Sequence, residues 1–118
     1  MPASDAAGVG ARKWEMTLSL EQFLRIAKAL ADARRFAILE RIADRGDAAC
    51  QHLCEEFPVS QPTMSHHLRT LVEAELIEMR RDGQFVHYHF RADVACAYVA
   101  TLQKRLALTG PSTARKRA

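Results

Sequence analysis

The 118-residue sequence has little of what marks a membrane, secreted or disulfide-bonded protein. No apolar run approaches the length of a membrane span or follows a charged, signal-like start, so we expect a cytoplasmic protein that does not bind membranes. The cysteines are Cys50, Cys54 and Cys96, an odd number that favours free thiols over a disulfide framework. This length predicts one small domain, for which dimerisation would be a natural source of further burial.

A strong excess of one charge is also missing from most of the chain. The net charge is +3, but five bases fall after residue 103 without a single acid. Removing these five from the 17 bases leaves twelve against fourteen acids in residues 1–103. Overall charge therefore does not indicate a nucleic-acid partner, and the basic end of the chain is either a salt-sensitive phosphate contact or a solvated tail.

The sequence lacks the patterns of an enzyme as well. It contains no nucleophile paired with a base, no paired carboxylates, no phosphate-binding loop and no cofactor fingerprint. A small, mostly helical domain also has no second lobe with which to form a cleft. We therefore predict a binding protein and not an enzyme.

Hydrophobic periodicity divides the chain into an arm, a domain and a tail. Residues 1–16 show no period and are predicted to be a flexible arm, residues 17–108 to form the domain, and residues 109–118 to be a basic, flexible tail. The predicted fold is mainly α with a small β-hairpin. The expected helices cover about 17–30, 32–46, 47–57, 60–76 and 93–108, and the expected strands cover 77–81 and 85–90, joined at Asp82-Gly83-Gln84.

The first and last predicted helices carry more apolar surface than one core needs. We interpret the second apolar edge of the first helix as a partner surface. The apolar positions are Leu20, Phe23, Leu24, Ile26, Ala27 and Leu30 in the first helix, and Val94, Tyr98, Val99, Leu102, Leu106 and Leu108 in the last.

The helix at 32–46 has clear end signals. Asp32 is placed to cap its start, and Gly46 to end it. Phe36 is expected on the inner face with Ile38, Leu39 and Ile42, while the outward residues are expected to be Arg34, Arg35, Glu40, Arg41 and Asp44.

The helix after Pro58 is the most informative part of the chain. Ser60 is placed as its N-cap, and Pro62 falls in the first turn, where proline is tolerated. Its open side carries hydroxyl, amide, imidazole and guanidinium groups that suit base edges and phosphates, and a basic hairpin follows. This layout predicts a winged helix-turn-helix that reads double-stranded DNA. The predicted DNA contacts are Gln61, Thr63, Ser65, His66 and Arg69 on the helix, and Arg80, Arg81 and Gln84 on the hairpin.

Several of these residues also have simpler structural interpretations. Thr63 could serve only to support the turn, and Arg69 could pair with Glu73 one helical turn later. The hairpin arginines could equally keep an edge strand soluble. His67 lies beside the apolar stripe, so packing explains it at least as well as a DNA contact does.

Three stretches, in this order, resemble the ArsR/SmtB family of bacterial winged-helix repressors over about residues 19–108. They are ALADARRFAIL at 29–39, VSQPTMSHHL at 59–68 and LIEMRRDGQFVHY at 76–88. The resemblance implies a homodimer formed by the first and last helices. It also implies a palindromic operator bound by paired recognition helices, and repression that ends when an inducer binds. The alternatives are a winged-helix protein-interaction module and a constitutive regulator without a small-molecule sensor.

The metal-sensing patterns that the resemblance implies are missing from the chain. The Cys-x-Cys pattern of arsenic and cadmium sensors would fall on Ala49 and Gln51. His87 and His89 share one face of a predicted strand, and His52 is a possible third ligand, but this combination matches neither metal-sensing pattern. The zinc-type pattern would begin at Asp93 and continue at Ala95, Leu106 and Thr109, which are not zinc ligands. The metal ligands, and whether there is a metal, are therefore left open.

Cys50 and Cys54 form the candidate thiol sensor. Their i, i+4 spacing places both on one helix face, close enough for a strained disulfide or for a shared soft metal or metalloid. The alternative is a buried core stripe with Leu53 and Phe57, since unpaired cysteine is often buried and inert. Cys96 offers a third thiol, for which packing on the last helix is the simpler role.

Overall fold

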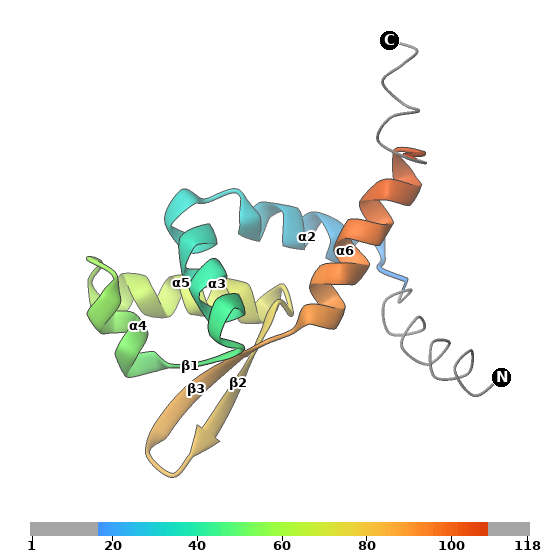
Figure 1. Ribbon diagram of the computed structural model, residues 1–118. Helices are drawn as coiled ribbons and strands as arrows, with labels where there is room; N and C mark the ends of the chain where they lie inside the picture. Colours follow the sequence, from blue (N-terminus) through green and yellow to red (C-terminus); the bar gives the residue numbers. More distant parts are fainter. Residues whose placement is uncertain (1–16, 109–118) are drawn as a thin grey trace, which may run out of the picture.

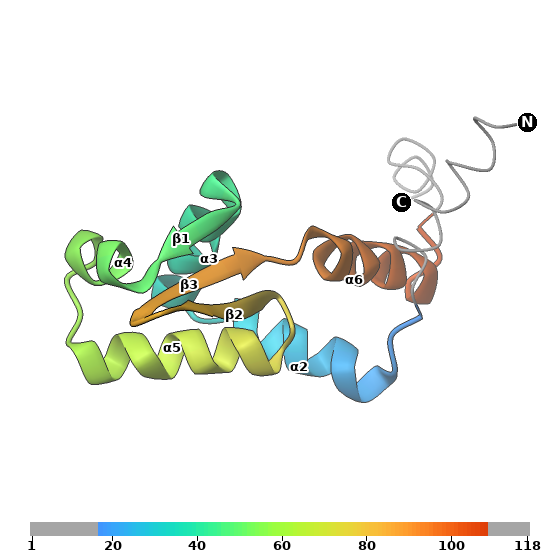
Figure 2. The ribbon, with the colours of Figure 1, turned by 90° about the horizontal axis from the view of Figure 1, so that it is seen from below.

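A computed structural model describes residues 17–108, in which five helices pack with a three-stranded sheet (Figures 1 and 2). The predicted arm, 1–16, and tail, 109–118, lie outside the described residues. No helix in the described part of the chain is long and apolar enough to cross a membrane. The elements are α2 (Leu20–Leu30), α3 (Ala33–Arg45), β1 (Asp47–Ala49), α4 (Cys50–Glu56), α5 (Gln61–Glu73), β2 (Ile77–Asp82), β3 (Phe85–Phe90) and α6 (Ala92–Arg105).

Local side chains fix the helix ends, as predicted. The Asp32 carboxylate accepts a hydrogen bond from the backbone N–H of Arg35 at 2.8 Å and caps α3. The Ser60 hydroxyl accepts from the backbone N–H of Thr63 at 3.2 Å and caps α5. Gly46 ends α3 with a φ of 80°, a left-handed conformation that glycine adopts without a steric penalty.

The sheet contains a short strand that the sequence did not predict. Residues 47–49 were expected to start a helix, but they form β1, with Asp47 opposite His89 and Ala49 opposite His87. β3 pairs with β2 along its other edge, giving the antiparallel order β1-β3-β2. The prediction was wrong because the hydrogen-bond partners of this segment lie far along the chain, where helical periodicity carries no information. As a result, α4 begins only at Cys50.

The hairpin and the last helix agree with the prediction apart from their ends. β2 extends to Asp82, which pairs with Phe85 and leaves Gly83 and Gln84 to form the turn. α6 ends at Arg105 and not at residue 108, because Ala107 adopts a φ of 55° that cannot continue a right-handed helix.

One hydrophobic core connects the helices with the inner face of the sheet. α5 contributes its predicted stripe and packs against α2, α3 and β2. Figure 2 shows α5 lying below the hairpin, with its first turn beneath α4. The fully buried large side chains of the described part are Ile26, Ile38, Ile42, Leu53, Met64, Leu68, Leu71, Leu76, Ile77 and Val94.

Two neighbouring residues of α3 point the opposite way from the prediction. Phe36, expected inside, is 42% exposed, whereas Arg35, expected outside, is half-buried and turns back toward α2. Positions 35, 38, 39 and 42 follow the i, i+3, i+4, i+7 pattern of one helix face. Arg35 is therefore in phase with the buried stripe of Ile38, Leu39 and Ile42, and Phe36 lies one residue out of phase.

The helices α2 and α6 keep large apolar side chains in contact with solvent. Leu20, Leu24, Val99 and Leu106, here called the apolar flank, are 49%, 47%, 53% and 61% exposed. The buried residues of α2 are Phe23, Ile26 and Ala29, and the ring of Phe23 stacks on Tyr98 of α6 at 4.9 Å between centroids. Figure 1 places both helices at the same end of the molecule, away from α4 and the hairpin turn. The second apolar edge predicted for the first helix is therefore present.

Candidate DNA interface

The exposed side of α5 carries the predicted polar side chains. Met64 and Leu68 are buried, and the residues between and around them that we expected to be open are all exposed. The hairpin β2–β3 supplies the wing. The reading surface, as we call it below, consists of Gln61, Ser65, His66 and Arg69 on α5, and Arg80, Arg81 and Gln84 on the wing.

Thr63 is tied into the helix cap. The Ser60 hydroxyl donates a hydrogen bond to Thr63 Oγ1 at 2.9 Å and accepts one from the Thr63 backbone N–H at 3.2 Å. Thr63 therefore has the supporting role that the sequence left open. A contact between Thr63 and DNA stays a prediction.

Most cations of the reading surface are not engaged within the protein. Among the described residues Arg69 makes no ion pair, so the alternative pairing with Glu73 does not form. Arg80 lies 3.4 Å from the Glu78 carboxylate, but both side chains are about half exposed, and such pairs contribute little in water. These guanidinium groups can therefore turn to phosphates without breaking a buried contact.

His67 points away from the reading surface. The ring is 8% exposed, and its Nδ1 lies 3.3 Å from Nη1 of Arg35. Burial lowers the pKa of His67, and Arg35 acts in the same direction, whereas Asp32 opposes the shift. The packed alternative is thus confirmed. Arg35 is a residue that the sequence prediction missed, although its phase on α3 could have revealed it.

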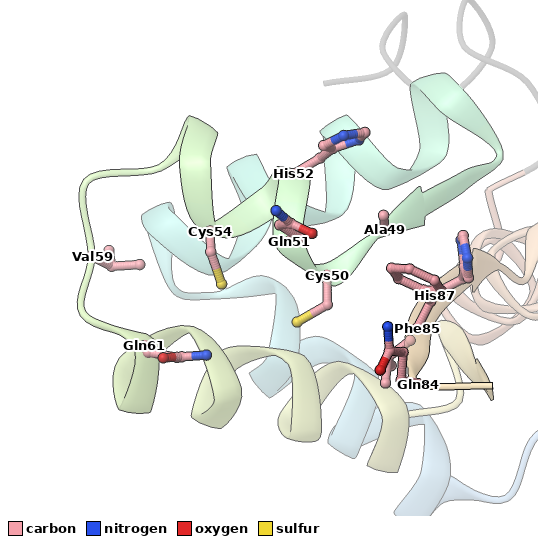
Figure 3. Close-up of a pocket in the computed structure, with 11 residues that line it drawn as sticks. Ala49, Cys50, Gln51, His52, Cys54, Val59, Gln61, Gln84, Phe85 and His87 are labelled. Carbon is pink, nitrogen blue, oxygen red and sulfur yellow. The ribbon is translucent and has the colours of Figure 1, made fainter. Parts of the chain in front are cut away.

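A pocket of about 800 Å³ lies between α4, the start of α5 and the wing (Figure 3). The sulfur atoms of Cys50 and Cys54 project from α4 toward α5. Gln61 and Gln84, both in the reading surface, line the same pocket. The sequence could not show this proximity, because it depends on how the wing folds back beside α4. The thiol pair is therefore adjacent to the residues predicted to contact DNA.

The three cysteines do not form one site. Cys50 and Cys54 pack partly against the core and partly line the pocket, so both sequence interpretations hold in part. Burial raises the pKa of the Cys50 thiol, and the neighbouring Cys54 adds to the shift. Cys96 lines a different, apolar pocket with Phe90 and Val99. A switch that combines all three thiols is therefore not supported by their positions.

The histidines of the sheet surround a carboxylate. Nδ1 of His87 lies 3.3 Å from one Asp47 oxygen, and Nδ1 of His89 lies 4.0 Å from the other. Within residues 17–108 there is no group of three or more histidine, cysteine or acidic side chains able to hold a metal ion. The combination of these histidines with His52 therefore does not form a metal site in this part of the chain.

The comparisons with known proteins agree with this arrangement. Residues 30–80 match the model of a family described as a helix-turn-helix domain. The transcriptional repressor SdpR of Bacillus subtilis (strain 168) is 38% identical over 69 residues, which cover 58% of this chain and 76% of that protein. The arsenical resistance operon repressor of Staphylococcus aureus is 41% identical over 66 residues, 56% of this chain and 62% of that repressor.

A solved structure is also similar to this chain. It is the homodimeric winged helix-turn-helix DNA-binding domain Mb0332 of Mycobacterium bovis, described as a possible ArsR-family regulator. It matches with 32% identity and a TM-score of 0.61, over 70% of this chain and 77% of that domain. The chain belongs to the ArsR family of winged helix-turn-helix regulators. In this ArsR-family chain, α5 is the recognition helix and β2–β3 is the wing, as the sequence predicted.

Proposed function

We propose that the protein is a homodimeric transcriptional repressor that binds a palindromic operator in the cytoplasm and has no catalytic role. The observation that carries this proposal is the reading surface, where uncharged hydrogen-bonding groups at the start of α5 lie beside the exposed cations of the wing. Relatives in S. aureus and B. subtilis are named as repressors, which supports the regulatory role.

The proposed docking places the start of α5 in the major groove. Ser65 and His66 are short enough to let the helix approach the base edges, with Gln61 at the rim. Arg69, one turn later, is placed for a phosphate. The wing then brings Arg80, Arg81 and Gln84 to the backbone or the adjacent minor groove.

The apolar flank supports the dimer. Leu20 and Leu24 on α2, Val99 on α6 and Leu106 directly after α6 expose apolar side chains at one end of the molecule, and such clusters mark interaction sites. The M. bovis domain is a homodimer, which favours a second copy as the partner. A two-fold dimer would present two recognition helices and so require two half-sites.

The double substitution Ser65→Glu with His66→Ala tests the docking. The glutamate would face the phosphates, and both changes lie on exposed positions, so we expect loss of DNA binding with an intact dimer. The assay is gel-shift affinity for the duplex immediately upstream of the chain's own gene. A scrambled duplex of equal length serves as the competitor. Arg41→Gln on α3 is the charge-matched control, because Arg41 is exposed and belongs neither to the reading surface nor to the apolar flank. Unchanged affinity of the double variant would contradict this docking. A wild type that does not prefer this duplex over the scrambled one would favour a protein-interaction module.

The pocket at Cys50 and Cys54 supports a thiol-based inducer site as a second part of the proposal. A soft metal or metalloid held by both sulfurs would lie beside Gln61 and Gln84 and could displace them from DNA. The test is release of the duplex after arsenite, cadmium or peroxide treatment, with Cys50→Ser and Cys54→Ser. Cys96→Ser is the control, because it lines another pocket. Release that persists in both pair variants would eliminate this pair as the sensor, whereas no release from the wild type would favour a constitutive regulator.

A further inference from the structure

A single guanidinium connects three helices behind the reading surface. Arg35, in the first turn of α3, donates from Nε to the backbone oxygen of Ala29 at 2.9 Å and from Nη2 to that of Lys28 at 3.3 Å. Both acceptors belong to the last turn of α2. The remaining nitrogen, Nη1, lies 3.3 Å from Nδ1 of His67 on α5. Arg35 thus connects α2, which carries part of the apolar flank, with the recognition helix.

The contact requires a neutral histidine. A guanidinium has only donors, so Nδ1 of His67 must accept the hydrogen bond and the ring proton must sit on Nε2. A second proton on Nδ1 would remove the acceptor and place two cations against each other. Because the ring is only 8% exposed, little water is present to screen them.

We propose that the contact between Arg35 and His67 positions the recognition helix against the corner between α2 and α3, and that protonation of His67 releases this constraint and weakens DNA binding. The inference rests on the proposed function, since the helix so positioned is the one expected to enter the groove. Neither residue is proposed to touch DNA. Both act through Ser65 and His66, which lie on the other side of the same helical turn.

The groups around His67 favour the neutral ring at neutral pH. Burial lowers its pKa, the cations Arg35 and Arg34 on α3 act in the same direction, and so does His66 on α5. The one opposing group is Asp32, whose own pKa is lowered chiefly by the hydrogen bond from the Arg35 backbone, so it stays charged. α2 contributes the two carbonyls already bonded to Arg35.

The direction of the pH effect follows from the lowered pKa. The unfolded chain takes up a proton on His67 near its ordinary pKa of about 6.5, before the folded protein does. The stability that the neutral ring contributes is therefore complete above that pH. It decreases as the pH falls below it. Within the folded protein, the contact that holds α5 is lost only at lower pH, as the pH falls through the lowered pKa of His67.

The key variant is His67→Asn, because the asparagine amide oxygen can stand near the position of Nδ1 and accept from Arg35 but cannot take up a proton. DNA affinity is measured by fluorescence anisotropy at constant ionic strength, at about pH 7.5 and about pH 5.5. The probe is the tightest duplex selected from a random pool. His52→Asn, on exposed α4, is the matched control, and both variants keep the other histidines.

We expect the wild type to lose roughly twofold to fourfold more affinity than His67→Asn between the two pH values, because a His67 with a pKa below its ordinary value is only partly protonated at about pH 5.5. His52→Asn should behave as the wild type. In the free protein, backbone amide NMR signals along α5 should titrate with His67 in the wild type and stay constant in His67→Asn. Equal pH dependence in all three proteins, with a titration confined to residue 67 itself, would overturn the proposal.

Arg35→Lys provides a second test that leaves His67 in place. Lysine keeps the charge but cannot reach all three acceptors with one planar group. We expect roughly fivefold weaker DNA binding at about pH 7.5, a flatter pH dependence and an unchanged dimer. Wild-type affinity and pH dependence in this variant would count against the positioning role. If the wild type selects no duplex, the proposed function is wrong. The NMR titration then still tests whether protonation of His67 changes α5 through its contact with Arg35.

Discussion

The reading surface and the apolar flank are both exposed, yet they differ in chemistry. The former carries hydroxyl, amide, imidazole and guanidinium groups on α5 and the wing, whereas the latter carries leucine and valine on α2 and α6. The polar groups can form hydrogen bonds with the phosphates and base edges of DNA, whereas these polar DNA groups cannot bury a leucine cluster. Apolar surface of this kind is stabilised by burial against another apolar surface. One chain therefore presents two sets of groups that call for two different partners.

The largest effect should come from placing charge in the apolar flank. Leu24→Glu with Val99→Glu would bury two carboxylates in the proposed dimer interface, so we expect a monomer in sedimentation equilibrium. Because a monomer offers one recognition helix instead of two linked ones, operator affinity should fall by at least about 100-fold. Met79→Glu on the wing strand β2 is a matched control for assembly, because Met79 has the same exposure as Leu24, 47%. If the double variant still forms the dimer, α2 and α6 do not form the interface.

A smaller effect is expected from removing one cation of the reading surface. Arg69→Ala should weaken binding to all DNA sequences alike and reduce the slope of log affinity against log salt by roughly 1.8 for a dimer, about 0.9 for each lost phosphate contact. Arg25→Ala is the control, because Arg25 on α2 is half exposed and pairs with Glu21 at 3.2 Å. A changed slope in the control, or an unchanged one in Arg69→Ala, would place the phosphate contacts elsewhere.

The helices α5 and α3 differ in how well the sequence predicted which of their residues are buried. The N-cap of α5 and its buried and exposed stripes follow from local spacing, so the positions of Ser60, Met64 and Ser65 could be predicted. In α3 the same method failed at Phe36 and Arg35, because a hydrophobic residue was assumed to face the core and a charged one to face solvent. The helical phase places Arg35 inside, where its donors find backbone carbonyls.

The remaining differences arise from contacts between distant segments. β1 exists only because β3 pairs with it, and the pocket beside Cys50 exists only because the wing returns toward α4. Neither leaves a local pattern in the chain. The sequence therefore predicted which residues are available to DNA, but not which side chains lie together behind or beside them.

Substitutions of Ser60 and Ser65 should distinguish an effect on protein stability from an effect on DNA affinity. Ser60→Ala removes the cap of α5 and should destabilise the protein by about 1 kcal/mol in urea unfolding. Ser65→Ala, an exposed position in the helix, should change the unfolding free energy by less than about 0.5 kcal/mol and yet weaken DNA binding. The opposite pattern, with Ser65 affecting stability and Ser60 not, would mean that the cap is not where the structure places it.

The smallest effect concerns the place where the recognition helix meets α2. Glu75 follows α5 with a φ of 66°, which is strained for any residue with a Cβ, and its carboxylate accepts a hydrogen bond from Gln22 Nε2 on α2 at 2.6 Å. Glu75→Gly relieves the strain and loses an exposed hydrogen bond, so we expect a net stabilisation of about 0.5 kcal/mol in urea unfolding. Gln22→Ala is the control, since it removes the same bond without relieving the strain and should slightly destabilise. If both variants destabilise equally, the bond between α2 and the end of α5 outweighs the backbone strain, and the two regions are coupled there as well as through Arg35.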